Sequence, residues 1–166
     1  MTIIDSKSIS SGLCILADEA VRMIQNNTPI KEIEDHLKGL TEKIKFCFIL
    51  PELKYLVKGG RVNKVIGVLG GLIHMKPILE IRDGAIVSAG KMVLSKDIAS
   101  AFYDFIKTKI KNTDKVYIAH NSLDAETKAL REKLASDYDT ETIKYLNPLL
   151  GVHAGPQCLA VVWLER

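Results

Sequence analysis

Two short, strongly apolar runs constrain the fold of this chain more than any other feature of its sequence. Residues 44–50 read IKFCFIL, and residues 158–164 read CLAVVWL. Each run is shorter than a typical helix and rich in β-branched or aromatic residues, which is typical of a strand buried on both faces. Helical and strand-like patterns alternate between the two runs. Residues 44–166 therefore predict an α/β domain, in which a mixed β-sheet is packed with helices.

The segments between these runs also predict the order of the elements. Residues 76–93 have the pattern of a β-hairpin that turns at Asp83-Gly84, a common two-residue hairpin turn. Residues 52–60 read as a short helix that ends at two glycines. The remaining segments are expected to form a helix and turn over 62–75, amphipathic helices over 96–110 and 123–138, and strands over 115–120 and 140–146.

Residues 1–43 have a different character. Their pattern is a short strand in TIIDS, a Ser/Gly loop, and two amphipathic helices whose apolar stripes begin near Leu13 and after Thr28. One strand and two helices have too little apolar surface to bury against each other. We therefore expect a boundary between residues 1–43 and 44–166, and a partner surface for the first of these segments.

Composition and charge exclude several classes of protein. With 47% hydrophobic and 26% charged residues the chain is globular, and its net charge of +3 arises from Lys and Arg scattered among acids. No basic block indicates nucleic-acid binding, and no apolar run approaches the roughly 20 residues of a membrane span. Cys14, Cys47 and Cys158 form no close pair, which favours free thiols, no metal site and a reducing, cytoplasmic location.

The sequence KGGR at 58–61 is the first candidate site. Gly59 and Gly60 allow a sharp turn and the close approach of a ligand. The guanidinium of Arg61 can hold a carboxylate or a phosphate through two hydrogen bonds. The same residues are also compatible with a helix C-cap followed by a surface arginine, and the motif alone leaves both interpretations open.

A second candidate is GVHAGP at 151–156, immediately before the last apolar run. We expect a glycine-framed loop in which His153 and backbone N–H groups face an anion, with Gly155 providing conformational freedom. The alternative is a structural histidine that is bonded to a backbone carbonyl.

Residues 66–79 form a third candidate, since they are strongly apolar yet contain three glycines and Met75. This composition suits the wall of an acyl tunnel, because methionine adapts to flexible ligands, and ordinary core packing favours it too. No P-loop, dinucleotide-binding, serine-hydrolase or zinc-protease motif occurs. Ser6 and Ser11 are candidate polar contacts without a recognisable activating base, so the residues offer no nucleophile and base set.

Four segments resemble, in the same order, motifs of the DegV family of bacterial proteins. IIDSKSISSGLCILADEA is similar to the family's strand and serine-rich loop before a helix, and LKYLVKGGRV to its Leu-x-Tyr-Leu-x-x-Gly-Gly-Arg signature. GLIHMKPILEIRDGAI resembles its Lys-Pro-Ile-Leu hairpin, and GVHAGPQCLAVVW its terminal Gly-x-His-x-Gly-Pro segment. Because four motifs share the family's order and extend over almost the whole chain, the resemblance is specific.

The resemblance implies a fatty-acid-binding protein with two α/β domains. Such a protein presents the carboxylate of a long-chain fatty acid to a separate ATP-dependent fatty-acid kinase, and it is itself neither an enzyme nor dependent on a cofactor. Arg61 and His153 match the family's carboxylate-side residues, and Gly59, Gly60 and Gly155 match its loop glycines.

Ser6 and Met75 complete the expected lipid-binding set. The resemblance further implies that residues 1–43 are the remnant of a first domain, most of which has no counterpart in this sequence. The family often has an arginine after the hairpin, where the kinase docks, whereas KMVLSK offers only Lys91 and Lys96. The resemblance therefore implies lipid binding more strongly than kinase docking.

Three functional hypotheses follow. The first is a lipid carrier, since burying an acyl chain provides roughly 0.8 kcal/mol per methylene. With half the tunnel missing, this carrier is expected to self-associate or to need a second polypeptide over its exposed face. The second is a truncated paralogue that binds no lipid and acts as an oligomerisation or interaction module. The third is an enzyme that uses His153 as a base or phosphate acceptor.

Overall fold

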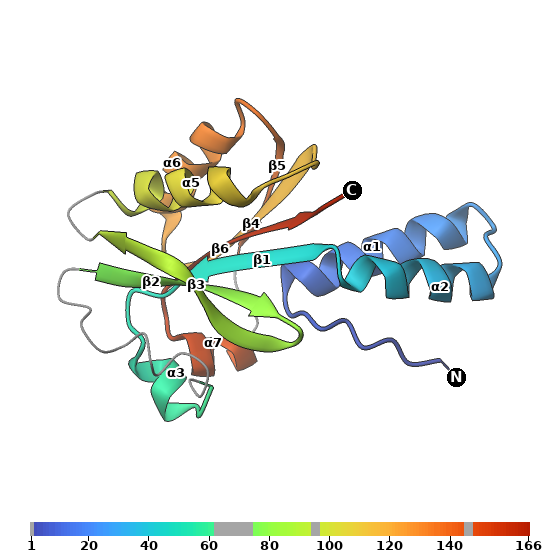
Figure 1. Ribbon diagram of the computed structural model, residues 1–166, viewed down its shortest axis with the longest axis horizontal. Coiled ribbons are helices and arrows are strands. Elements are labelled where there is room, and N and C mark those ends of the chain that lie inside the picture. The colour runs from blue at the N-terminus through green and yellow to red at the C-terminus, as the bar shows by residue number, and fades with distance from the viewer. Residues whose placement is uncertain (1, 62–74, 94–96, 145–147) are drawn as a thin grey trace.

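The computed structural model describes residues 2–61, 75–93, 97–144 and 148–166. These residues form a mixed six-stranded sheet in the order β3-β2-β1-β6-β4-β5 (Figure 1). Neighbouring strands are antiparallel except for β4 and β5, which are parallel. The strands are β1 Ile44–Ile49, β2 Met75–Arg82, β3 Ala85–Val93, β4 Lys115–Asn121, β5 Asp139–Lys144 and β6 Cys158–Leu164. The predicted mixed sheet of an α/β domain is confirmed.

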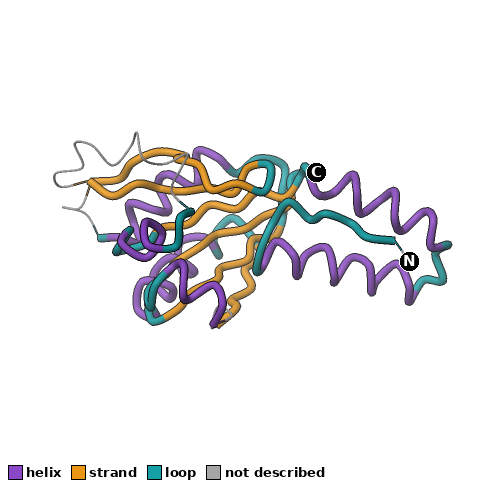
Figure 2. Tube along the Cα trace, turned by 90° about the horizontal axis from the view of Figure 1, so that it is seen from below, coloured by secondary structure: helices purple, strands orange, loops and turns teal. Residues whose placement is uncertain are grey.

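Helices cover both faces of this sheet. α5 and α6 lie together on one face, and α3 and α7 lie on the other (Figure 1). α1 and α2 form a helical hairpin that projects beyond the sheet, as the perpendicular view in Figure 2 also shows. The helices are α1 Ser11–Gln25, α2 Ile30–Thr41, α3 Lys54–Lys58, α5 Ile98–Lys109, α6 Asp124–Leu134 and α7 Pro148–Ala154.

The central strand β6 shows why the sheet is buried on both faces. Its side chains alternate between the two faces, and six of its seven residues are buried. Cys158, Ala160 and Val162 belong to the apolar cluster on the α3–α7 face, and the other buried residues to the cluster under α5 and α6. Full burial of a single Val or Leu side chain contributes roughly 1.5–3 kcal/mol to stability. The prediction of a strand covered on both sides is confirmed.

The α3–α7 face of the sheet is called the cavity face below. Its core includes Phe46, Phe48 and Leu56, and it continues without interruption into residues of the α1–α2 hairpin such as Leu16 and Leu37. The apolar stripes of α1 and α2 therefore share one core with the sheet, and the sheet provides a partner surface for residues 1–43. The division into domains 1–43 and 44–166 stays a prediction.

The β2–β3 turn has the geometry that its residues require. Asp83 and Gly84 have φ of 51° and 71°, and Arg82 pairs with Ala85 across the turn. Positive φ at both central positions is typical of a type I′ turn, whose twist matches that of a hairpin. The hairpin predicted from Asp83-Gly84 is confirmed.

The strand predicted over residues 2–6 is wrong. These residues lie in an irregular segment that precedes α1, and no described strand pairs with them. A strand exists only with a hydrogen-bonded neighbour, so a β-prone sequence without one remains extended coil. The two predicted helices are confirmed as α1 and α2, and the strand predicted from residue 44 is confirmed as β1.

The predicted loop at 151–156 is also wrong in part, because its first four residues lie in the helix α7. Pro148 suits the first turn of a helix, where its missing N–H is not needed. Gly155 ends the helix with a φ of 85°, and its N–H donates to the Gly151 carbonyl at 2.8 Å. The helix and turn predicted over 62–75 lie outside the described residues except for Met75, which begins β2.

Candidate functional site

A cavity of about 420 Å³ lies on the cavity face of the sheet. This volume falls within the roughly 300–1,000 Å³ that is usual for small-molecule sites. The floor is apolar and includes Phe46 and Phe48 of β1 and Ala160 of β6. These side chains point to the same side because alternate residues of a strand share a face.

Three groups of residues surround this floor. Residues 7–10, called the strap below, precede α1 and run beside the β2–β3 turn. At this turn the Lys7 Cα lies 3.9 Å from the position that a Cβ added to Gly84 would occupy. The remaining wall comes from α3 and the residues after it, from α7 and from the start of β6. The lining outside the floor is Lys7, Ser8, Ile9 and Ser10; Ile81, Gly84, Ala85 and Ile86; and Leu56, Gly60, Arg61, Leu150, His153, Ala154 and Cys158.

His153 lines the cavity from the last turn of α7. Its Nδ1 atom is buried and has no hydrogen-bond partner among the described residues. A Cβ placed on Gly59 would lie 2.6 Å from this nitrogen, so glycine at position 59 is what allows the imidazole to sit here. Nδ1 is enclosed beside Gly59, which does not line the cavity, so a ligand in the cavity would contact the rest of the imidazole.

Arg61 lies on the same wall, three residues after α3. Its side chain is exposed, and Nη1 donates to the Gly59 carbonyl at 2.5 Å. The described part of the chain supplies no carboxylate that pairs with this guanidinium. The structure thus brings Arg61, His153 and Gly60 together around one hollow, with the guanidinium at its solvent-facing rim.

Tyr55 and Gly155 form a second contact between α3 and α7. A Cβ on Gly155 would lie 2.4 Å from Cδ2 of the Tyr55 ring. The two segments are therefore interlocked: Gly59, at the end of α3, makes room for His153, and Gly155, at the end of α7, makes room for Tyr55. This arrangement fixes the position of the imidazole at the cavity.

Ser8, in the strap, is a lining residue that the sequence did not single out. Its Oγ is enclosed beside Gly12, which does not line the cavity, and finds no hydrogen-bond partner within the described ranges. The Ser6 hydroxyl turns back along the strap, donating to the Ser8 carbonyl at 3.1 Å and accepting from the Ser8 N–H at 3.3 Å. The serine-rich composition of DSKSISSG pointed to this loop, but no local signal distinguishes Ser8 from its neighbours.

The other predicted site residues lie around the cavity instead of on its surface. Gly59 and Gly155 stand behind the wall, where they accommodate His153 and Tyr55. Ser6 is not a lining residue, and neither is Met75, which pairs with Val93 at the far end of the β2–β3 hairpin. The lipid-binding roles assigned to these residues, and to Arg61, His153 and Gly60, stay predictions.

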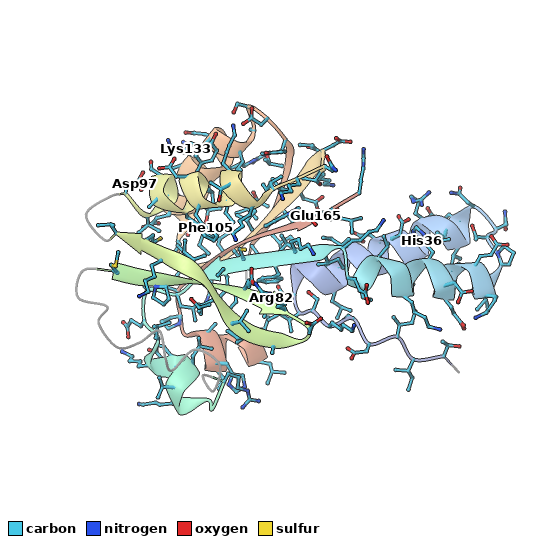
Figure 3. All side chains as sticks on the ribbon, in the orientation of Figure 1. His36, Arg82, Asp97, Phe105, Lys133 and Glu165 are labelled. Carbon is cyan, nitrogen blue, oxygen red and sulfur yellow. The ribbon has the colours of Figure 1, made fainter. Side chains whose placement is uncertain are left out.

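The remaining histidines have other surroundings. His36 is exposed on α2, and its Nε2 lies 2.7 Å from Glu19 Oε1 on α1 (Figure 3). His120 is buried in β4. His74 lies outside the described residues.

A second hollow, of about 660 Å³, is strongly polar and differs in kind from the cavity. It lies where the end of α5 meets β1, β2 and β6, and Arg82 and Glu165, both labelled in Figure 3, contribute to it. Arg82 pairs with Glu80, and Lys45 approaches Glu165 to 3.7 Å. Because its charges of both signs pair with one another, this hollow is poorly suited to an apolar ligand.

The described residues show neither a reactive thiol in the cavity nor a metal cluster. Burial raises the pKa of Cys158, which lines the cavity, to about 12, and that of Cys47 likewise to about 12. The thiolate, which is the nucleophilic form, is therefore disfavoured at both positions. No three His, Cys, Asp or Glu side chains in the described ranges can share a metal ion. None of the helices found there has the length and apolar character needed to cross a membrane.

Relatives of this chain share its fold and extend beyond it. A DegV domain-containing protein from Clostridium acetobutylicum is 32% identical over 169 residues, which cover 99% of this chain and 60% of the relative. A solved structure described as fatty acid binding of a DegV family protein from Thermus thermophilus superposes with a TM-score of 0.87 at 18% identity, over 99% of this chain and 61% of that one.

The Streptococcus pneumoniae Fatty Acid Kinase (Fak) B3 protein loaded with linoleic acid superposes with a TM-score of 0.83 at 22% identity, over 99% of this chain and 60% of that one. These structural matches establish the shared fold, and the chain spans about 60% of the length of all three relatives. The family profile described as "Uncharacterised protein, DegV family" matches residues 1–166. The resemblance seen in four sequence segments is thereby confirmed, and the chain belongs to the DegV family.

Proposed function

We propose that this chain binds a long-chain fatty acid, whose acyl chain lies on the apolar floor of the cavity and whose carboxylate meets Arg61 and His153. The observation that carries the proposal is the cavity itself. An apolar floor with Phe46 and Phe48 adjoins His153 and the exposed Arg61, whose guanidinium has no carboxylate partner within the described part of the chain. The solved relatives support the same ligand class, since their descriptions name fatty acid binding and linoleic acid.

The two parts of the ligand would contribute different amounts to binding. Each buried methylene provides roughly 0.8 kcal/mol, so a long chain gains about 10 kcal/mol before the costs of ordering. A hydrogen bond to a charged group contributes about 1.5–3 kcal/mol. The acyl chain therefore sets the affinity, whereas Arg61 and His153 set the direction in which the molecule enters.

In this proposal the chain acts as a carrier and does no chemistry itself. Arg61 is exposed, so a carboxylate held beside it would face solvent and a second protein. The relative named as part of a fatty acid kinase supports a kinase as that second protein. No cofactor or metal enters the proposal, and the phosphorylation of the carboxylate would take place on the partner.

The test is binding of hexadecanoic acid to delipidated protein, measured by calorimetry and by mass spectrometry of an organic extract. We expect Arg61→Ala and His153→Ala each to weaken binding by roughly tenfold or more, because each removes a charge-assisted hydrogen bond. Arg131→Ala, an exposed substitution on α6, is the control and should bind normally. Failure to bind any fatty acid would refute the proposal, and so would wild-type affinity in both Arg61→Ala and His153→Ala.

A second candidate function is self-association through α1. Leu13, Val21 and Ile24 of this helix are 53%, 52% and 61% exposed, although they recur at the spacing of one apolar stripe. An unpartnered stripe of this kind favours an oligomerisation module. Sedimentation of the wild type and of Val21→Glu distinguishes the two functions, because a pure interaction module would lose its oligomer and bind no lipid in either state.

A further inference from the structure

The floor of the cavity presents its side chains in rows that cross the strands. Phe46 pairs with Ile81, and Ile81 pairs with Ile86, so these three residues form one row, called the tail row below. Phe48 pairs with Ala160 and belongs to the next row on the same face. Successive rows on one face lie two residues, or about 7 Å, apart along a strand. All five residues line the cavity, so its floor extends over both rows.

The tail row lies away from the proposed carboxylate site. His153 is on α7, which is followed by β6, and Leu159 near the start of β6 pairs with Ile49, the last residue of β1. Phe46 comes three residues before Ile49, which corresponds to about 10 Å of strand. An acyl chain that starts at the α7 end of the floor and follows β1 therefore passes Phe48 before it reaches the tail row.

The strap and the β2–β3 turn lie against each other beside the tail row. A Cβ on Gly84 would lie 3.9 Å from the Lys7 Cα, which is ordinary van der Waals contact. The Ser6 hydroxyl bonds both polar backbone atoms of Ser8 and gives the strap a defined bend. Lys7 and Gly84 both line the cavity, so the strap and the turn bound its tail end.

The second, polar hollow begins at the tail row. Lys7, Phe46 and Ile81 line both the cavity and the second hollow. The pairing between β1 and β2 that the structure describes also ends at Phe46 and Ile81. Glu42 lines only the second hollow, and its Oε1 lies 3.8 Å from Lys7 Nζ, so the ammonium of Lys7 lies on the polar side of this boundary.

This boundary limits the gain from a longer acyl chain. Each methylene that is buried on the apolar floor should strengthen binding roughly fourfold. A methylene that extends past the tail row instead meets charged side chains, and placing it there would desolvate them without an apolar contact in return. Affinity should therefore rise with chain length until the tail reaches this row, and then level off.

We propose that the tail row sets the acyl length beyond which affinity stops rising, and that Ile86 is a residue that determines this length. Ile86 lines the cavity, is half-buried, and lies on β3 at the edge of the sheet, so its size can change without replacing a residue of the central core. The inference rests on the proposed function, because it takes the carboxylate to be held at Arg61 and His153.

The experiment measures the affinity of saturated, even-numbered fatty acids from octanoic to icosanoic acid, by calorimetry on the delipidated full chain. We expect a rise of roughly fourfold per methylene up to one break length, and less than about twofold per methylene beyond it. Ile86→Phe fills the tail end and should move the break to a shorter acid. Ile86→Ala enlarges the tail end and should move the break to a longer acid.

Val87→Phe is the matched control. Val87 is the next residue on β3 and pairs with Glu80, so its side chain points to the opposite face of the sheet from that of Ile86. This substitution should keep the wild-type break length. Urea unfolding of each variant shows whether it is folded, and Ile86→Ala carries the test if Ile86→Phe does not fold.

The outcomes separate this inference from the proposed function. Affinity that rises steadily through icosanoic acid would overturn the inference and leave fatty-acid binding intact. A break length that stays unchanged in the folded variants at position 86 would also overturn it, as would an equal shift in Val87→Phe. If no acid of any length binds, the proposed function fails, and the inference fails with it.

Discussion

Replacing Gly155 by alanine tests the interlock between α3 and α7. Gly155 has a φ of 85°, and a Cβ at this position would lie 2.4 Å from the Tyr55 ring. The left-handed conformation costs an alanine about 1–2 kcal/mol. Overpacking against the ring adds about 1–3 kcal/mol. We therefore expect Gly155→Ala to lower the free energy of unfolding by about 2–5 kcal/mol.

A double-mutant cycle separates these two contributions. Tyr55→Ala removes the ring but leaves the backbone conformation of position 155 unchanged. In a Tyr55→Ala background, Gly155→Ala should therefore cost only the conformational part, about 1–2 kcal/mol. The coupling energy between the two positions should be about 1–3 kcal/mol, the size of the steric contribution.

Urea unfolding, followed by the fluorescence of Trp163, measures these energies, since Trp163 is the chain's single tryptophan and is buried in β6. Gly151→Ala is the matched control, because it lies within α7 and a Cβ there meets nothing within 4 Å. This control should be neutral or stabilising by up to about 1 kcal/mol. A stability loss in Gly155→Ala no larger than in Gly151→Ala, or no coupling to Tyr55, would refute the interlock.

Two further substitutions test the surroundings of His153 and the α1–α2 contact. Gly59→Ala places a Cβ 2.6 Å from His153 Nδ1 and should displace the imidazole. Calorimetry should therefore show roughly tenfold weaker fatty-acid binding. Gly39→Ala is the control and should bind normally, because a Cβ at position 39 meets nothing within 4 Å. The hydrogen bond from Arg22, with a smaller effect of His36, lowers the pKa of Glu19 from 4.5 to about 2. The stability that Glu19 provides should thus be complete above about pH 5 and be lost as the pH falls towards 2. Urea midpoints of Glu19→Gln should depend less on pH in this interval than those of the wild type, and an unchanged profile would contradict the assignment.

The sequence predicts the elements that depend on contacts between neighbouring residues. It does not predict the elements that depend on contacts between residues far apart in the chain. Asp83-Gly84 specifies the hairpin because its own backbone preferences create the turn. Residues 2–6 have strand-like residues, but no strand in the described ranges pairs with them, so their local pattern is misleading. In the same way GVHAGP looks like a loop because of its glycines, although Gly155 ends a helix that begins at Pro148.

The same distinction between local and distant contacts applies to the residues of the candidate site. Arg61 and His153 were predicted from their glycine neighbours, which indicate close approach of the backbone, and both line the cavity. Ser8 and Ser10 also line the cavity but were not predicted, because four serines occur between residues 6 and 11 and only the path of the strap determines which of them reach it. Met75 was predicted to contact lipid because a methionine side chain is flexible, but flexibility does not determine where a residue lies in the sheet.

The lining of the cavity argues that it is a binding site and not a packing defect. Its apolar floor, with Phe46 and Phe48, adjoins the exposed guanidinium of Arg61, which has no carboxylate partner among the described residues. A ligand that covers this floor and pairs with Arg61 contributes free energy only when bound. Fatty-acid binding should therefore stabilise the chain against urea. Arg61→Ala, at an exposed position, should reduce that gain while sparing the stability of the ligand-free protein.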